Sequence, residues 1–65
     1  MCLCNNIRIY RERLGLSQSY LGKLVGVSKN AISSYERLSY CPSAYIAARL
    51  CSVFNCSFSD LFYFN

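Results

Sequence analysis

The sequence predicts an all-α fold, a compact five-helix bundle built around two short helices that are joined by a tight turn. Serines precede several apolar runs that have helical spacing, and a glycine follows one of these runs where a helix has to stop. No segment has the apolar–polar alternation of a good strand. The chain has 65 residues, of which 54% are hydrophobic, so we expect residues 1–65 to form one small domain.

The first predicted helix covers about residues 6–14, with Ile7, Tyr10 and Leu14 on its inward side. The next two helices follow Ser17 and Ser28. A serine in this position can accept a hydrogen bond from a backbone N–H of the first turn that has no partner within the helix. The spacing therefore predicts two capped helices within about residues 17–37.

The turn between these two helices gives the most specific signal. Gly26 stands at the end of the first of them, where a left-handed conformation costs glycine less than any residue with a Cβ atom. Gly22 leaves room for the second helix to approach at a steep angle. The spaced set behind this prediction is Leu21, Gly22, Val25, Gly26, Val27, Ile32 and Tyr35. Such a set is typical of a helix-turn-helix, which places its second helix in the major groove of duplex DNA.

The remaining residues predict two further helices. Pro42 closes the preceding loop, and Ser43 caps a fourth helix that extends to about residue 54. Its apolar stripe consists of Ala47, Leu50, Cys51 and Phe54. Ser57 and Asp60 have the spacing of a capping box and begin a short fifth helix. The apolar residues of that helix are Phe58, Leu61 and Phe62.

The chain resembles the phage-repressor (Cro-like, XRE-type) helix-turn-helix family, whose domains are five-helix bundles of about this length. The matching residues are Ile7, Arg8, Arg11, Gly15, Leu16, Ser17, Gln18, Leu21, Gly26, Val27, Ser28, Ile32, Ser33, Tyr35, Glu36, Arg37, Pro42, Ser43, Asp60, Leu61 and Phe62. The chain departs from the family pattern in three places. Gly22 replaces a more common alanine, Leu38 stands where a glycine usually ends the recognition helix, and loop 39–41 lacks lysine and arginine.

The resemblance implies a sequence-specific regulator of transcription, and a repressor in the style of phage switches. It also implies an ion pair between Arg11 and Glu36, for which the alternative is two solvated surface charges. Gln18 matches a family position that contacts the DNA backbone, and it lies at a helix N-terminus whose amides favour an anion. The alternative function is a helix-turn-helix protein-interaction module, such as an antitoxin or a regulator's inhibitor, with little DNA binding.

The outer face of the predicted recognition helix carries the candidate site. Lys29 can donate to guanine O6 or N7, and Asn30 can pair with adenine N6 and N7. Ser33 and Ser34 are short enough for the helix to lie deep in the groove. The predicted base-reading residues are Lys29, Asn30, Ser33 and Ser34, and the predicted backbone contacts are Gln18, Ser28 and Arg37. The alternative is a polar, solvated helix face without a ligand.

The net charge and the cysteine content of the chain restrict the kinds of function that it can have. The net charge of +4 is compatible with nucleic-acid binding. The five cysteines lack paired CxxC spacing and the chain has no histidine, so we expect no metal site, no cofactor, no small-molecule ligand and no enzyme activity. We expect Cys51 and Cys56 to act as reduced, small apolar residues, and Cys2 and Cys4 to lie exposed at a frayed end. No apolar run is long enough to span a membrane, and we expect a cytoplasmic protein.

The expected partners are a double-stranded DNA operator and a second copy of the chain. The C-terminal segment is more apolar than a short terminal helix needs for its own packing, and it comprises Phe58, Leu61, Phe62, Tyr63 and Phe64. We therefore expect a homodimer through this segment. The alternative is that these side chains complete the core of a small monomer.

Overall fold

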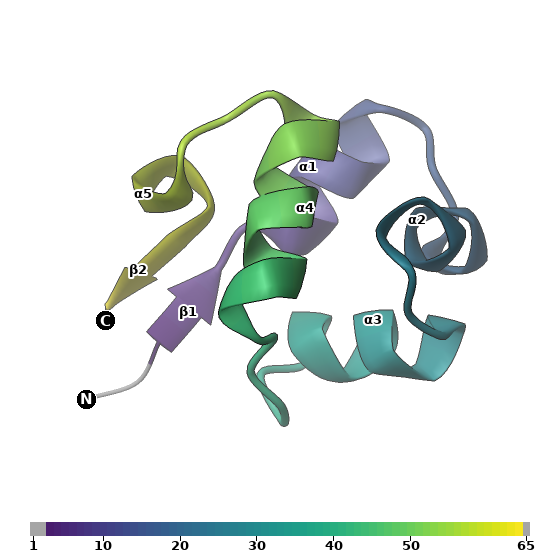
Figure 1. Cartoon of the computed structure of the whole chain (residues 1–65), viewed down its shortest axis with the longest axis horizontal. Coiled ribbons are helices and arrows are strands. Elements are labelled where there is room, and N and C mark those ends of the chain that lie inside the picture. The colour runs from purple at the N-terminus through teal and green to yellow at the C-terminus, as the bar shows by residue number, and fades with distance from the viewer. Residues whose placement is uncertain (1–2, 65) are drawn as a thin grey trace.

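The computed structural model of the protein describes residues 3–64. It contains five helices and a two-stranded sheet in the order β1 (Leu3–Asn5), α1 (Ile7–Arg13), α2 (Gln18–Val25), α3 (Lys29–Glu36), α4 (Ala44–Phe54), α5 (Phe58–Leu61) and β2 (Phe62–Phe64). The predicted five-helix bundle is confirmed. Figure 1 shows α4 crossing in front of α1, with α2 on the right, α3 along the lower edge and the sheet on the left.

Four of the five helices begin at a serine whose hydroxyl accepts a hydrogen bond from the backbone N–H three residues later. These serines are Ser17, Ser28, Ser43 and Ser57, and all four caps were predicted. Asp60 completes the capping box of α5 by accepting from the Ser57 N–H. Because helices of four to eleven residues are marginal on their own, these caps and the tertiary contacts decide where each helix begins.

The first four helices end in the same way. A residue with positive φ follows each helix, and the next N–H bonds to the carbonyl five residues earlier, which is the Schellman arrangement. The left-handed residues are Gly15, Gly26, Leu38 and Asn55, with φ of 69°, 84°, 62° and 54°. The closing bonds run from Leu16 to Arg11, Val27 to Gly22, Ser39 to Ser34 and Cys56 to Cys51, at 3.1, 2.9, 3.1 and 3.1 Å.

The core lies between α1, α2, α3 and α4. It consists of Ile7, Leu21, Val25, Ile32, Tyr35, Ala47, Leu50, Phe54, Leu61 and Phe62. Gly22 is essential to the contact of α2 with the turn, since a Cβ atom there would lie 2.6 Å from the Val27 carbonyl oxygen. The prediction that Leu14 points inward is wrong, because it is 54% exposed. Leu14 follows the last residue of α1, and the chain turns away from the core at Gly15.

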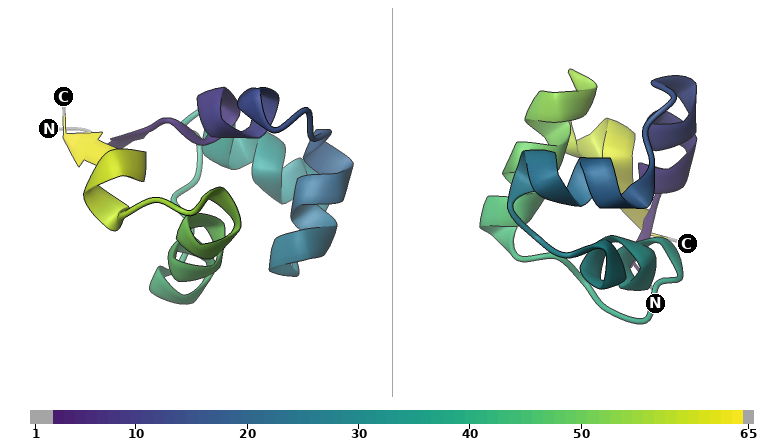
Figure 2. Two further views of the ribbon diagram at one scale, coloured as in Figure 1. Left: turned by 90° about the horizontal axis from the view of Figure 1, so that it is seen from above. Right: turned by 90° about the vertical axis from the view of Figure 1, so that its right-hand side faces the viewer.

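The expectation of no strand is also wrong. β1 and β2 pair in antiparallel register, with Leu3 opposite Phe64 and Asn5 opposite Phe62. The left view of Figure 2 shows this ribbon projecting from one end of the bundle. Each strand has only three residues and its partner lies at the other end of the chain, so no local alternation could reveal it.

The ribbon corrects two further predictions. Phe62 belongs to β2 rather than to the fifth helix. Cys4 is paired with Tyr63 and half-buried instead of lying at a frayed end, whereas Cys2 lies outside the described residues. Over residues 3–64, none of the helices has the length and apolar character needed to cross a membrane.

Candidate nucleic-acid interface

Helix α3 has one buried face and one polar face. Ile32 is fully buried and Tyr35 is 5% exposed, so both anchor the helix in the core. On the opposite side Lys29, Asn30 and Arg37 are exposed. Because side chains three and four positions apart are neighbours on a helix, the outer residues form one continuous surface.

The structure brings the four predicted base-reading residues together on this surface. Lys29 and Asn30 stand in the first turn of α3, while Ser33 and Ser34 follow one turn later and are half-buried. Arg37 lies beside them, with its Nη2 atom 3.5 Å from the Ser34 hydroxyl. Asn30 and Arg37 are two turns apart, near the start and at the end of α3. Figure 1 places α3 along the lower edge of the molecule.

The other two predicted backbone residues stand at helix starts. The Ser28 hydroxyl accepts a hydrogen bond from the Ala31 N–H at 3.1 Å, and its own proton can still be donated. Gln18 is the first residue of α2, and its Nε2 donates to Glu36 Oε1 at 3.1 Å. The sequence did not reveal the hydrogen bond between Gln18 and Glu36, because the two residues are 18 positions apart and no local pattern connects them.

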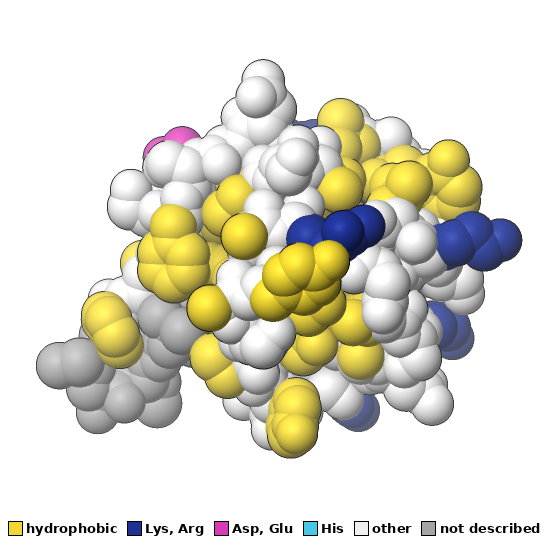
Figure 3. Space-filling model, viewed as in Figure 1, with side chains coloured by type: hydrophobic (Ala, Val, Ile, Leu, Met, Phe, Trp, Pro, Cys, Tyr) yellow, Lys and Arg dark blue, Asp and Glu magenta, His cyan; other side chains and the backbone are white. Residues whose placement is uncertain are grey.

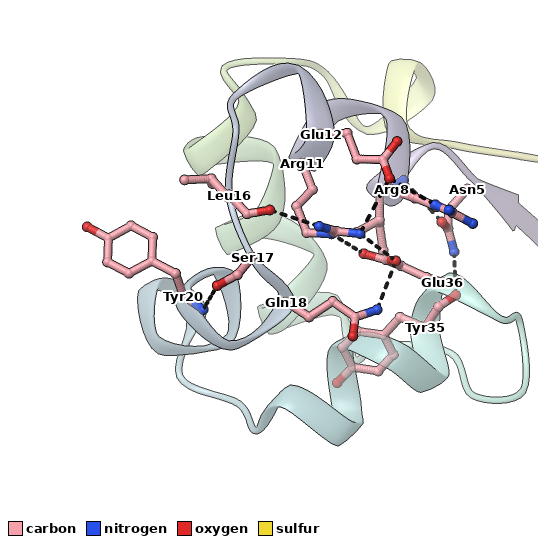
Figure 4. Close-up of polar contacts among 11 residues, drawn as sticks. Asn5, Arg8, Arg11, Glu12, Leu16, Ser17, Gln18, Tyr20, Tyr35 and Glu36 are labelled. Carbon is pink, nitrogen blue, oxygen red and sulfur yellow. Dashed lines mark hydrogen bonds and ion pairs between the residues drawn. The ribbon is translucent and has the colours of Figure 1, made fainter.

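Glu36 is the centre of a polar network that joins α1, α2 and α3 (Figure 4). Arg11 donates from Nε to Glu36 Oε2 at 2.6 Å and from Nη2 to Oε1 at 3.2 Å. Its Nη1 donates to the Leu16 carbonyl at 2.8 Å. The side chains of Arg11 and Glu36 are only 12% and 5% exposed, so the predicted ion pair is confirmed and is largely desolvated.

The network around Glu36 fixes the positions of its side chains and also shifts the pKa of Arg11. The hydrogen bond to Glu36 raises the pKa of Arg11 above its ordinary value, against the opposing effect of burial. A fixed guanidinium holds Glu36 at the end of α3, and Glu36 in turn holds the Gln18 amide at the start of α2. The end of α3 and the start of α2 are thereby held in one relative orientation.

Asn5 also helps to hold α3 in position, a role that the sequence did not reveal. Its Nδ2 donates to the Tyr35 carbonyl at 2.9 Å, and its Oδ1 accepts from the Ile7 N–H at 3.1 Å. The same residue belongs to β1 and lies opposite Phe62 of β2. Asn5 therefore links the ribbon to the start of α1 and to the last turn of α3 (Figure 4).

The charges are unevenly distributed. Of the seven basic residues, Arg8 and Arg11 form ion pairs with glutamates, and the other five form none with any residue in 3–64. On the face drawn in Figure 3, Lys and Arg side chains lie over the right-hand and lower parts, around α2 and α3. A further Lys or Arg side chain lies at the centre of this face, and the acidic side chain visible there lies at the upper left.

Three comparisons place the chain among known proteins. The helix-turn-helix family profile matches residues 7–61. The uncharacterized HTH-type transcriptional regulator YgzD of Bacillus subtilis (strain 168) is 34% identical over 59 residues, which covers 91% of this chain and 89% of the relative. An uncharacterized HTH-type transcriptional regulator of Archaeoglobus fulgidus is 39% identical over 59 residues, covering 91% and 84%.

The solved structures agree with the sequence matches. The P22 c2 repressor protein, in a crystal structure with a synthetic operator, superposes with a TM-score of 0.80 and 39% identity over 83% of this chain and 82% of that one. A protein from Bacteroides fragilis superposes with a TM-score of 0.83 over 94% and 98%, and at 20% identity it supports the fold alone. The chain belongs to the phage-repressor (Cro-like, XRE-type) helix-turn-helix family, a family of DNA-binding transcriptional regulators and not of enzymes.

Proposed function

We propose that the protein is a cytoplasmic repressor that acts as one domain and inserts α3 into the major groove of an operator. The observation that carries this proposal is the polar outer face of α3, opposite a face that Ile32 and Tyr35 fix in the core. A reading helix needs both features. It must present hydrogen-bonding groups at the groove and it must not rotate when it meets the DNA.

The residues of this face divide by role. Lys29 and Asn30 stand nearest the N-terminus of α3, from which side chains reach base edges. The Lys29 ammonium can donate to guanine, and the Asn30 amide can pair with adenine. The side chains of Ser33 and Ser34 are short, so they allow the helix to lie close to the bases. Each good contact to a base is worth about 1–3 kcal/mol of discrimination.

A second group of residues contacts the phosphates in this proposal. Arg37 supplies a charge at the edge of the face, and Ser28 supplies a hydroxyl at the start of α3. Gln18 stands at the N-terminus of α2, where backbone amides also favour an anion. Its bond to Glu36 holds the side chain before DNA arrives, which lowers the entropy lost on binding.

Two variants separate reading from backbone contact. Asn30→Ala is expected to lose about 1–3 kcal/mol on the preferred operator and to relax preference at one base pair. Arg37→Ala is expected to weaken binding to all duplexes equally and to reduce the dependence of log K on log salt by about one unit. Titrations at several salt concentrations measure both effects. Ser52→Ala, an exposed position on α4, is the control. Unchanged base preference in Asn30→Ala would contradict the proposed roles.

We also propose that the protein binds as a homodimer through its C-terminal segment. Leu61 and Phe62 are buried in the core, but Phe58, Tyr63 and Phe64 are 57%, 45% and 66% exposed. The core of one copy thus uses only part of the aromatic tail. The ribbon of two strands also has open edges, which a second strand can pair with. Two-fold symmetry would then set two α3 helices about 34 Å apart on a pseudo-palindrome.

Sedimentation measures the dimer directly. Phe64→Ser is expected to shift the wild-type dimer to monomer, since it removes an exposed aromatic side chain from the segment. Tyr40→Ser removes an equally exposed ring, 70% accessible, from the loop after α3 and serves as the control. A wild-type protein that stays monomeric well above the concentrations used for DNA binding would contradict the dimer.

The second candidate function is a protein-interaction module. It is favoured by the surface after α3, where Leu38 and Tyr40 are 50% and 70% exposed and loop 39–41 contains no basic residue. Absence of DNA binding at low salt, together with a stable heteromeric complex, would favour this function over the first.

A further inference from the structure

We infer that Cys51 and Cys56 form a dithiol site that a peroxide converts reversibly into a disulfide. The inference is independent of DNA binding. It starts from the way α4 ends, because the Schellman arrangement brings two specified positions together.

The positions that meet are the third residue before the helix cap and the second residue after it. In α4 these are Cys51 and Cys56, joined by an N–H···O bond of 3.1 Å. The accompanying bond from the Asn55 N–H to the Ser52 carbonyl is 3.3 Å, so both bonds of the motif are present. Covalent geometry then keeps the two Cα atoms within about 7 Å, and a disulfide usually spans 4.4–6.8 Å, on the order of that separation.

The motif also turns the side chains of these two positions toward each other. In many proteins an apolar contact occurs between them. At the end of α4 the two thiols are near enough for a side-chain hydrogen bond with Cys51 to contribute to the pKa of Cys56. At the end of α4 both positions carry a thiol, and both are half-buried against the core.

The surroundings assign the order of reaction. Burial raises the pKa of Cys56, and the neighbouring Cys51 thiol raises it further. Cys56 is therefore ionised less than an ordinary thiol at neutral pH, which suits the thiol that reacts second. Of the other described thiols, Cys4 lies in the ribbon and Cys41 is exposed in the loop before α4, so neither stands at this turn.

The chemistry needs hydrogen peroxide as the oxidant. The Cys51 thiolate attacks one peroxide oxygen, the O–O bond breaks, and hydroxide leaves and is protonated to water. Cys56 then attacks the sulfur of the sulfenic acid. An S–S bond forms, the S–O bond breaks, and a second water leaves. Two thiols and one peroxide thus give one disulfide and two waters, and a small dithiol reverses the step.

Trypsin separates the cysteines cleanly. Cleavage after Arg8, Arg37 and Arg49 leaves Cys51 and Cys56 together on peptide 50–65, Cys41 on peptide 38–49, and the two N-terminal cysteines on a third. The folded protein is treated with peroxide, alkylated and digested. Peptide 50–65 is expected to lose two hydrogens in mass and to take no alkyl group until it is reduced. Two alkyl groups on that peptide after Cys41 has been oxidised would overturn the inference.

Variants test the pairing and its dependence on the fold. Cys51→Ser and Cys56→Ser should each abolish the mass loss, whereas Cys41→Ser should leave it unchanged. When the protein is unfolded in denaturant, the same peroxide treatment should give disulfides between several different pairs of cysteines. The oxidised wild type should also melt above the reduced protein, because a bond that fits the native turn restricts the unfolded chain. An oxidised form that melts lower would show that the turn does not accommodate the bond.

Discussion

Leu38 is the residue whose backbone conformation is least suited to its side chain. It ends α3 with a φ of 62°, a left-handed value that Gly15 and Gly26 adopt without a clash at the ends of α1 and α2. For a residue with a Cβ atom this conformation costs about 1–2 kcal/mol. The side chain recovers little of that cost, because it is 50% exposed.

Leu38→Gly is therefore expected to stabilise the protein by about 1 kcal/mol, after the entropy cost of glycine is subtracted. Chemical denaturation measures the change. Asn55→Gly is the matched control, since Asn55 has a φ of 54° at the end of α4 and asparagine tolerates this region better. A loss of stability in Leu38→Gly would show that the apolar contacts of Leu38 outweigh its backbone strain.

The ion pair between Arg11 and Glu36 is a second feature at the residue scale. Removing one partner leaves a desolvated charge, so Arg11→Met and Glu36→Leu are each expected to cost about 3 kcal/mol or more. The double variant is expected to cost less than the sum of the two. Thermal and chemical melts of the three variants give the coupling free energy between Arg11 and Glu36. Small and additive effects would contradict the energetic role of the network.

The buried phenol of Tyr35 predicts a loss of stability at alkaline pH. Burial raises the pKa of Tyr35 above 10.0 and that of Cys56 above 9.0 in the folded protein. The unfolded chain releases these protons first, so stability is full below pH 9 and falls as pH rises through the unfolded values. Unfolding free energies measured between neutral and alkaline pH are expected to fall less steeply in Tyr35→Phe than in wild type.

At the scale of elements, the sequence predicted the features that depend on neighbouring residues. The starts of α2, α3, α4 and α5 needed only a serine and the apolar run that follows it. Gly26 marked the end of α2 because glycine alone fits its backbone freely. The end of α3 was harder to place, since Leu38 occupies the left-handed position without the usual glycine.

The ribbon escaped prediction because its strands are short and lie 57 or more positions apart in the chain, from Asn5 to Phe62. Only the folded bundle brings them together. The positioning role of Asn5 was hidden for the same reason, since its partners are a carbonyl of α3 and the strand that contains Phe62. Sequence patterns report local structure and buried faces, whereas such contacts depend on the complete fold.

Asn5→Ala is expected to cost about 1–3 kcal/mol, because it removes the cap of the Ile7 N–H and leaves the Tyr35 carbonyl without this donor. Asn6→Ala is the matched control. Asn6 donates from an exposed side chain to the Asp60 carbonyl, so its loss should be smaller. Equal losses of unfolding free energy for the two variants in urea titrations would show that the hydrogen bonds of Asn5 stabilise the fold no more than the hydrogen bond of Asn6.

At the scale of the whole molecule, the structure has two ends with different chemistry. The polar face of α3 and the basic side chains around it lie apart from the aromatic tail on α5 and β2 (Figure 3). In the proposed function, the α3 end contacts DNA and the C-terminal end contacts a second copy of the chain. The residues predicted to read bases lie on one surface of α3, and their role stays a prediction. The sequence could not reveal the hydrogen bond that holds Gln18 and Glu36 together.

Selection from a random pool of duplex DNA tests the central claim most directly. The protein is incubated with the pool at moderate salt, and the retained duplexes are sequenced. A homodimer that reads bases through α3 predicts enrichment of a pseudo-palindrome whose half-sites lie about one helical turn apart. A pool that stays random while the protein remains folded would contradict sequence-specific binding and would favour the protein-interaction module.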